Sequence, residues 1–157
     1  NNNNMNTTPT LATMDEQVTA SIHLVIPRTE MQEEMDPAIV ELYSTLGAQG
    51  IGPTGPLFSY HHRMPTDTFD FEIGVPIDGA LQETGRVKVS KLPACRVVRT
   101  IYHGPYEGLG DAWQEFMTAV DEASYEFGST FWERYVVGPA DTQDPSQFQT
   151  ELNRVLC

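Results

Sequence analysis

One glutamate in the sequence lies among aromatic residues, where an apolar side chain would be expected. Glu133 sits between Trp132 and Arg134 in a segment that alternates like a β-strand. A carboxylate there is solvated at an edge, paired with an arginine, or kept in a pocket. In a pocket it would attract a cation strongly, because Coulomb energy scales inversely with the dielectric constant. Aromatic faces would add about 0.5–2 kcal/mol each through cation–π contacts. The chemistry that this segment could perform is therefore cation binding.

Two rows of side chains could form the walls of such a pocket. Each row consists of alternate residues of one predicted strand: Phe58, Tyr60 and His62 in the first, and Phe131, Glu133 and Tyr135 in the second. We predict that the two rows face each other across one cleft.

Two further aromatic residues are candidates for the same pocket. Tyr106 follows a Gly-Pro turn next to a predicted helix. Its side chain either packs over this turn or lines the pocket, and the sequence leaves both alternatives open. Trp113 and Phe116 fall at helical spacing, which favours the core, although the upper edges of both rings could reach a ligand. We include Tyr106 and Trp113 among the ligand-binding candidates.

No pattern in the sequence predicts catalysis or a metal site. His61 and His62 are adjacent, so a strand would point them to opposite faces. His23 and His103 have no Cys or carboxylate pattern around them. No nucleophile elbow, phosphate loop or dinucleotide fingerprint is present, and neither cysteine resembles a positioned nucleophile. We therefore expect no catalytic residue, no metal ligand and no cofactor.

The elements that must position these residues follow one plan twice. Apolar alternation predicts extended segments at 18–28, 57–62, 69–77, 87–89, 95–102, 130–137 and 148–156. Asp36 as N-cap and Pro37 as first helical residue open a helix that carries the stripe from Ile39 to Leu46. A second amphipathic stripe, from Leu109 to Ala123, predicts another helix.

The two halves also match in their letters. Residues 58–60 align with residues 133–135, and residues 71–73 with residues 150–152. We therefore predict an α+β fold made of a duplicated β-α-β-β unit. Its six-stranded, mostly antiparallel sheet would carry two helices on one face, with a pseudo-two-fold axis between the halves. Ligand clefts often form where such halves meet.

Composition limits the function classes. Nine Lys and Arg against 22 Asp and Glu give a formal net charge of −13, which argues against direct binding of nucleic acid or of an anionic membrane. The polar residues 1–17 predict a disordered leader before a single domain over 18–157. No long apolar run, signal peptide or disulfide framework is visible, so the expected location is cytoplasmic.

Three runs of residues, at 71–76, 102–106 and 131–139, occur in that order in the sequence. Together they resemble the gyrase-inhibitor-like small-molecule-binding domains, which also serve as effector-binding modules of some AraC-type and MerR-type regulators. The resemblance covers residues 18–157 and implies the duplicated β-α-β-β fold. It also implies lipophilic, often cationic drugs as ligands, with Glu133 and Tyr135 at the acidic and tyrosine positions of an aromatic pocket. The last strand departs from the pattern because it lacks the Val-Pro ending of the first repeat.

The resemblance leads to one functional prediction and two alternatives. We expect a stand-alone module for lipophilic cations, related to members carried on mobile gene cassettes, without a helix-turn-helix and without direct contact to nucleic acid or membrane. The first alternative is a hydrolase of strained cyclopropane-bearing compounds, as in some relatives, with a glutamate beside a tyrosine to activate water. The second is a gyrase-inhibiting protein whose acidic surface mimics DNA and binds a protein partner.

Overall fold

Nine strands form one sheet in the computed structural model, which describes residues 5–123 and 125–156. The strands are β1 (Met5–Asn6), β2 (Thr10–Met14), β3 (Gln17–Pro27), β4 (Phe58–His61), β5 (Thr68–Pro76), β6 (Lys88–Leu92), β7 (Cys95–His103), β8 (Phe127–Val137) and β9 (Gln149–Leu156). They lie in the order β1-β7-β9-β8-β4-β5-β3-β6, with β2 paired to β7 off this path. The α+β class and the mostly antiparallel sheet are confirmed, but the predicted number of six strands is wrong.

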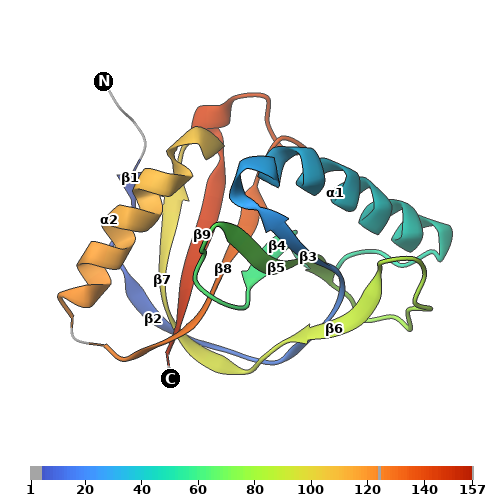
Figure 1. Cartoon of the computed structure of the whole chain (residues 1–157), viewed down its shortest axis with the longest axis horizontal. Helices are drawn as coiled ribbons and strands as arrows, with labels where there is room; N and C mark the ends of the chain where they lie inside the picture. Colours follow the sequence, from blue (N-terminus) through green and yellow to red (C-terminus); the bar gives the residue numbers. More distant parts are fainter. Residues whose placement is uncertain (1–4, 124, 157) are drawn as a thin grey trace.

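Two α-helices among the described residues cover one face of this sheet (Figure 1). Helix α1 (Met31–Ala48) packs on β3 and β5, and helix α2 (Leu109–Asp121) packs on β7. Figure 1 shows β8, β9 and β4 running between the two helices. The described residues also contain three short 3-10 turns: η1 (Arg28–Glu30), η2 (Tyr106–Gly108) and η3 (Pro145–Gln147).

The clearest alternation in the sequence lies under α1. Phe71, Ile73 and Val75 of β5 are fully buried and belong to one core cluster with Leu42 and Leu46 of α1. Helix α2 covers a separate cluster on β7 and β9. The helix-covered face therefore has two cores, one at each side of β8.

Helix α1 begins earlier than predicted. It starts at Met31, so Asp36 is not its N-cap and Pro37 lies inside the helix. A proline in a helix interior costs about 3 kcal/mol, because it removes one backbone hydrogen bond and crowds the preceding turn. Met31 and Met35 pack against the core cluster under α1. Their burial extends the apolar stripe by more than one turn upstream and offsets that cost.

Residues before β3 also differ from the prediction. The expected disordered leader over 1–17 is wrong for β1 and β2, which pair with β7, while residues 1–4 lie outside the described residues. Strand β2 buries no side chain fully: Leu11 is 47% exposed, and Ala12 and Met14 on the other face are half-buried. Its backbone hydrogen bonds to β7 therefore carry the pairing, and no hydrophobic alternation marks it in the sequence.

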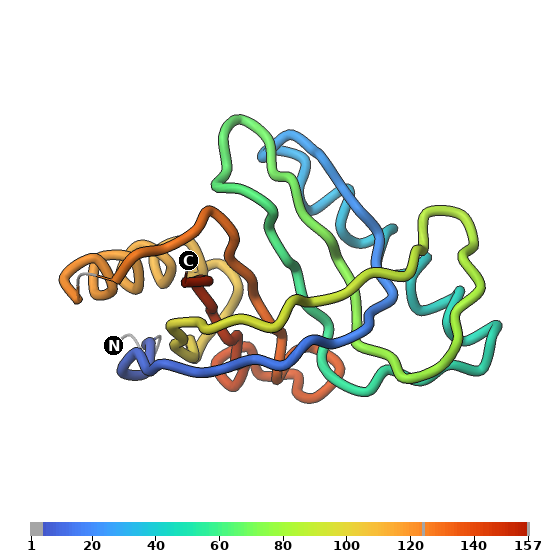
Figure 2. Tube along the Cα trace, turned by 90° about the horizontal axis from the view of Figure 1, so that it is seen from below, coloured from blue at the N-terminus to red at the C-terminus, as the bar shows by residue number. Residues whose placement is uncertain are grey.

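A two-stranded ribbon crosses the second face of the sheet. The chain from β2 into β3 runs beside the chain from β6 into β7 across the molecule (Figure 2). Met14, Leu92 and Cys95 of this ribbon pack with Phe58 and other residues of the central strands in a third core cluster. Gly74 of β5 lies under Phe58, and a Cβ atom there would come within 2.9 Å of the ring of Phe58.

The element order supports two similar halves. The order β3-α1-β4-β5 is followed by β7-α2-β8-β9, and β4 pairs with β8 at the centre of the sheet. The duplication itself stays a prediction.

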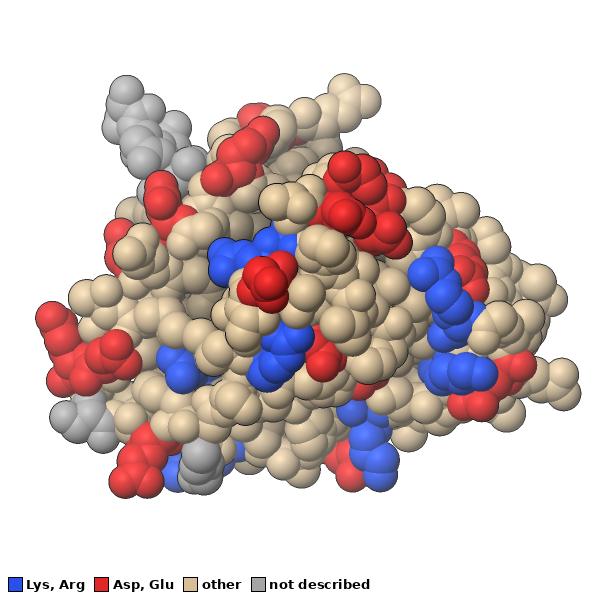
Figure 3. All heavy atoms as spheres, viewed as in Figure 1, with Lys and Arg blue, Asp and Glu red and all other residues tan. Residues whose placement is uncertain are grey.

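The surface carries many acidic side chains. On the face in Figure 3 they lie over both helices, with basic side chains scattered between them. Within the described part of the chain, no helix is long and apolar enough to cross a membrane.

Candidate functional site

Glu133 lies at the centre of the helix-covered face, and both of its carboxylate oxygens accept a hydrogen bond. The indole Nε1 of Trp113, in α2, donates to Oε2 at 2.6 Å. The hydroxyl of Tyr135, two residues along β8, donates to Oε1 at 2.7 Å. Ser59 of β4 lies 2.8 Å from the same hydroxyl. Because that hydroxyl has one hydrogen, Ser59 acts as the donor to Tyr135.

The electrostatic setting of this carboxylate is unusual. Burial raises the pKa of Glu133, and the hydrogen bonds from Tyr135 and Trp113 oppose that rise. Burial and the neighbouring Glu133 charge raise the pKa of Tyr135 well above its ordinary value, so Tyr135 remains a donor. Among the described residues, no Lys, Arg or His nitrogen pairs with the Glu133 carboxylate within 4.0 Å. The site therefore holds a desolvated carboxyl group without a basic partner among the described residues.

Aromatic rings surround the carboxylate. The ring of Trp113 meets Phe131 edge to face at 5.1 Å between centroids. Tyr106 meets Tyr135 in the same way at 6.0 Å, and it is 37% exposed. Five predicted residues are thus brought together: Tyr106, Trp113, Phe131, Glu133 and Tyr135.

The predicted partner row lies on the opposite face of the sheet. Ser59 is directly across from Glu133 in the β4–β8 pairing, and Tyr60 is across from Trp132. Directly paired residues of antiparallel strands share a face. The prediction that Phe58 and Tyr60 face the same cleft as Glu133 is therefore wrong. Both residues belong to the third core cluster, where Tyr60 packs on Trp132 at 5.4 Å between centroids.

The alternate residues of β4, Ser59 and His61, lie on the same face as Glu133 instead. The ring of His61 stacks on Phe131 at 4.5 Å and on Phe71 at 4.9 Å between ring centroids. The sequence contains the signal, a polar residue at every second position of an aromatic strand, but only the pairing register decides which set faces Glu133.

The buried His61 leads to a prediction for stability against pH. Burial, and secondarily the neighbouring His62, lowers the pKa of His61 from 6.5 to about 4. Between these values only the unfolded chain takes up the proton. The part of the unfolding free energy that depends on a neutral His61 is therefore present above pH 6.5. It is lost as the pH falls toward 4, by up to about 3 kcal/mol.

We expect His61→Phe, which fits the aromatic stack, to remove this loss. Urea unfolding at pH 7 and pH 4.5 measures it, and His103→Gln, outside the stack, is the matched control. An unchanged pH dependence in His61→Phe would contradict the assignment.

Three hollows in the described surface have volumes of about 480, 390 and 110 Å³. The first lies over β3 and β5 on the second face, and the other two lie beside β1. Glu133 lines none of these three, so the candidate site is defined by its side chains rather than by one of these hollows.

The comparisons with known proteins identify the class of domain. A protein-family model, the GyrI-like small molecule binding domain, matches residues 7–153. The chain therefore belongs to the GyrI-like small-molecule-binding domain family. A search of the curated proteins finds no match.

Solved structures share the fold at low sequence identity. The EcmrR C-terminal domain has a TM-score of 0.82 and 21% identity, over 96% of this chain and 97% of that one. A structure of EcmrR with DNA has a TM-score of 0.81 and 22% identity over 95% of this chain, which spans only 57% of the EcmrR chain.

Two other similar structures have more distant sequences. SAV2435 bound to tetraphenylphosphonium has a TM-score of 0.67 and 10% identity, over 96% of this chain and 94% of that one. A hydrolase from Listeria innocua has a TM-score of 0.68 and 12% identity, over 95% and 91%.

Proposed function

We propose that this domain binds lipophilic cations, with Glu133 as the charged contact and the surrounding aromatic rings as the apolar contact. The observation that carries the proposal is a desolvated carboxylate that accepts two hydrogen bonds and has no basic partner among the described residues. Such a group costs free energy when it ionises, and a cationic ligand would offset that cost.

The aromatic residues fit a large apolar cation. Trp113, Phe131 and Tyr135 place three ring systems around the carboxylate, and Tyr106 forms its exposed border. Ring faces attract a diffuse positive charge as well as burying apolar area. A small hydrated cation would not gain from these rings, so the proposal favours ligands with aryl groups.

Entry of the ligand depends on the side chains that border Glu133, which is itself half-buried. Trp113 is held to the carboxylate by one hydrogen bond, and Tyr106 is partly exposed. Rotation of these two rings would open the carboxylate while β4 and β8 keep it in place. Side-chain changes of this kind are common when ligands bind.

The proposal is tested with two ions of the same shape and opposite charge. Tetraphenylphosphonium and tetraphenylborate present four phenyl groups around one central atom. We expect saturable calorimetric binding of the phosphonium and much weaker binding of the borate, because Glu133 would repel the anion. Equal affinity for both ions, or preference for the borate, would contradict the proposal.

A second candidate function is hydrolysis. The observation that favours it is the raised pKa of Glu133 beside the Tyr135 hydroxyl, since a carboxyl group that titrates nearer neutral pH can exchange protons with water. Chromatography of a cyclopropane-bearing ligand after incubation with the protein distinguishes the two functions: a binder returns the ligand unchanged, whereas a hydrolase converts it.

A further inference from the structure

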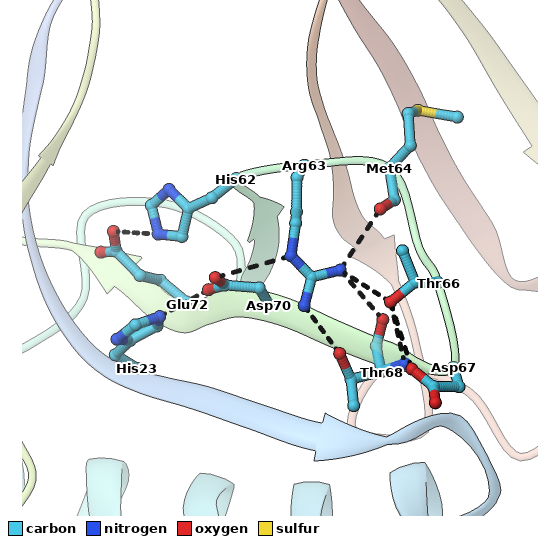
Figure 4. Close-up of polar contacts among 9 residues, drawn as sticks. All are labelled: His23, His62, Arg63, Met64, Thr66, Asp67, Thr68, Asp70 and Glu72. Atoms are coloured by element: carbon cyan, nitrogen blue, oxygen red, sulfur yellow. Dashed lines mark hydrogen bonds and ion pairs between the residues drawn. The ribbon is translucent and has the colours of Figure 1, made fainter.

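A second polar cluster lies on the other face of the sheet (Figure 4). It consists of His23 in β3, Asp70 and Glu72 in β5, and His62 directly after β4. The Nε2 atom of His23 lies 2.6 Å from Oδ1 of Asp70, and Nε2 of His62 lies 2.9 Å from Oε2 of Glu72. Each imidazole therefore faces one carboxylate, and Figure 4 shows the four side chains turned toward one another.

The sheet itself brings these side chains together. His23 is directly across from Glu72 in the β3–β5 pairing, and the backbone N–H of His62 donates to the carbonyl of Asp70 at 2.9 Å. Asp70 and Glu72 are two residues apart on one strand, so they project from the same face. The rings of His23 and His62 meet edge to face at 5.4 Å. The cluster is thus fixed by three segments that are distant in the sequence.

The donor atoms are close to the spacing of a metal site. One donor atom from each of His23, His62 and Asp70 lies within 4.8 Å of the other two. Ligand atoms around a tetrahedral zinc ion are about 3.3 Å apart, given bonds of about 2.0 Å. Small rotations of the exposed His23 and the half-buried His62 and Asp70 would close this difference.

The charges around the cluster favour a bound cation. The carboxylates of Asp70 and Glu72 both stand beside the two imidazoles. Ser21 donates to Oε1 of Glu72 at 2.8 Å and holds the second carboxylate beside His62. On the opposite side, Arg63 approaches only the other oxygen of Asp70, with its Nε 3.9 Å from Oδ2.

The cluster is also open to solvent. The side chains of His23 and His62 are 57% and 37% exposed, and both line the hollow of about 480 Å³ with Glu72. Arg86 and Lys88 line the same hollow, but Arg86 is paired with Glu41 at 2.8 Å. An ion can therefore enter from solvent and keep an open position toward the hollow.

We propose that His23, His62 and Asp70 bind a divalent late transition-metal ion of the Zn²⁺ type, and that Glu72 adds a second negative charge beside it. Two imidazole nitrogens and a carboxylate oxygen form a donor set that suits such ions, whereas Mg²⁺ and Ca²⁺ prefer oxygen ligands alone. This site lies on the opposite face from Glu133 and is independent of the proposed ligand function.

The test uses the full chain without a histidine tag, stripped of metal by a chelator. Calorimetry with Zn²⁺ should show saturable binding of one ion per chain, and Mg²⁺ should give none. His23→Gln and His62→Gln should each weaken Zn²⁺ binding by more than about tenfold, since even the loss of groups that only support metal ligands has effects of about that size. The matched control, His103→Gln, should bind Zn²⁺ like the wild type.

Cobalt provides a second measurement at the same residues. Co²⁺ bound by nitrogen and oxygen ligands gives visible ligand-field bands, which should appear in the wild type and be absent from the double variant with both histidines replaced by Gln. Circular dichroism shows whether the double variant folds. If it does not fold, the Co²⁺ bands are compared between the wild type and each single variant. Absence of saturable Zn²⁺ binding, or equal losses in His103→Gln, would overturn the proposal.

Discussion

Replacement of Glu133 by Gln should weaken the binding of tetraphenylphosphonium by some tens- to thousands-fold in dissociation constant. Loss of a charge contact inside a desolvated site typically costs about 2–5 kcal/mol. The substitution keeps the size of the side chain and an oxygen that can accept from Trp113, so the packing should survive. Calorimetric titration of both proteins with the same phosphonium measures the effect.

Two controls separate charge from shape. Neutral triphenylphosphine oxide should bind the variant about as well as the wild type, because it lacks the charge contact. Glu107→Gln removes the same charge from an exposed position next to Tyr106 and should leave phosphonium binding nearly unchanged. Equal losses for the phosphonium and the neutral ligand would mean that Glu133 maintains the shape of the site, and no loss for either would place it outside the site.

The same variant has an expected effect on stability. Because burial raises the folded-state pKa of Glu133 above 4.5, its contribution to stability is present below pH 4.5 and is lost as the pH rises through the folded-state value. Glu133→Gln should therefore be at least as stable as the wild type at pH 7. A melting curve checks this and shows that the binding assay uses folded protein.

Replacement of Glu151 by Gln should destabilise the domain by about 3–5 kcal/mol, the usual cost of breaking a buried ion pair from one side. Glu151 is 5% exposed, and its Oε1 lies 2.9 Å from Nε of Arg134 and 3.3 Å from Nε of Arg99. Asn153 donates to the same oxygen at 3.0 Å. Without the carboxylate, two guanidinium groups would share one neutral amide across β7, β8 and β9.

Urea unfolding measures this loss against a matched control. Glu16→Gln makes the same substitution in an exposed pair, where the carboxylate lies 3.7 Å from Nζ of Lys91. Exposed pairs of this kind contribute about 0–1 kcal/mol. If Glu151→Gln loses no more stability than Glu16→Gln, the ion pairs of Glu151 with Arg99 and Arg134 do not hold the strands together.

Local patterns in the sequence predict much of the fold. The alternation of Phe71, Ile73 and Val75 identifies a strand with one buried face, because side chains of a strand repeat with a period of two. The helical stripes identify α1 and α2 in the same way. The start of α1 is missed because Pro37 looks like a first helical residue, whereas the burial of Met31 and Met35 comes from tertiary packing.

The candidate site is predicted only in part for a similar reason. Phe131, Glu133 and Tyr135 belong to one strand, so their shared face follows from their spacing alone. The partner row depends on how β4 is aligned with β8, and a shift of one residue exchanges Ser59 for Tyr60. The cluster of His23 and His62 depends on pairing between separate strands, so no spacing in the sequence reveals it.

The most direct test of the proposed ligand site follows the two tryptophan side chains during a phosphonium titration. Trp113 donates its indole N–H to Glu133, whereas Trp132 is fully buried on the opposite face. The chain has two tryptophans, so a ¹H–¹⁵N spectrum contains two indole signals, and Trp113→Phe assigns them. We expect the Trp113 signal to shift with saturating phosphonium while the Trp132 signal stays nearly constant. A shift of the Trp132 signal alone, or saturable binding that leaves the Trp113 signal in place, would contradict binding at Glu133.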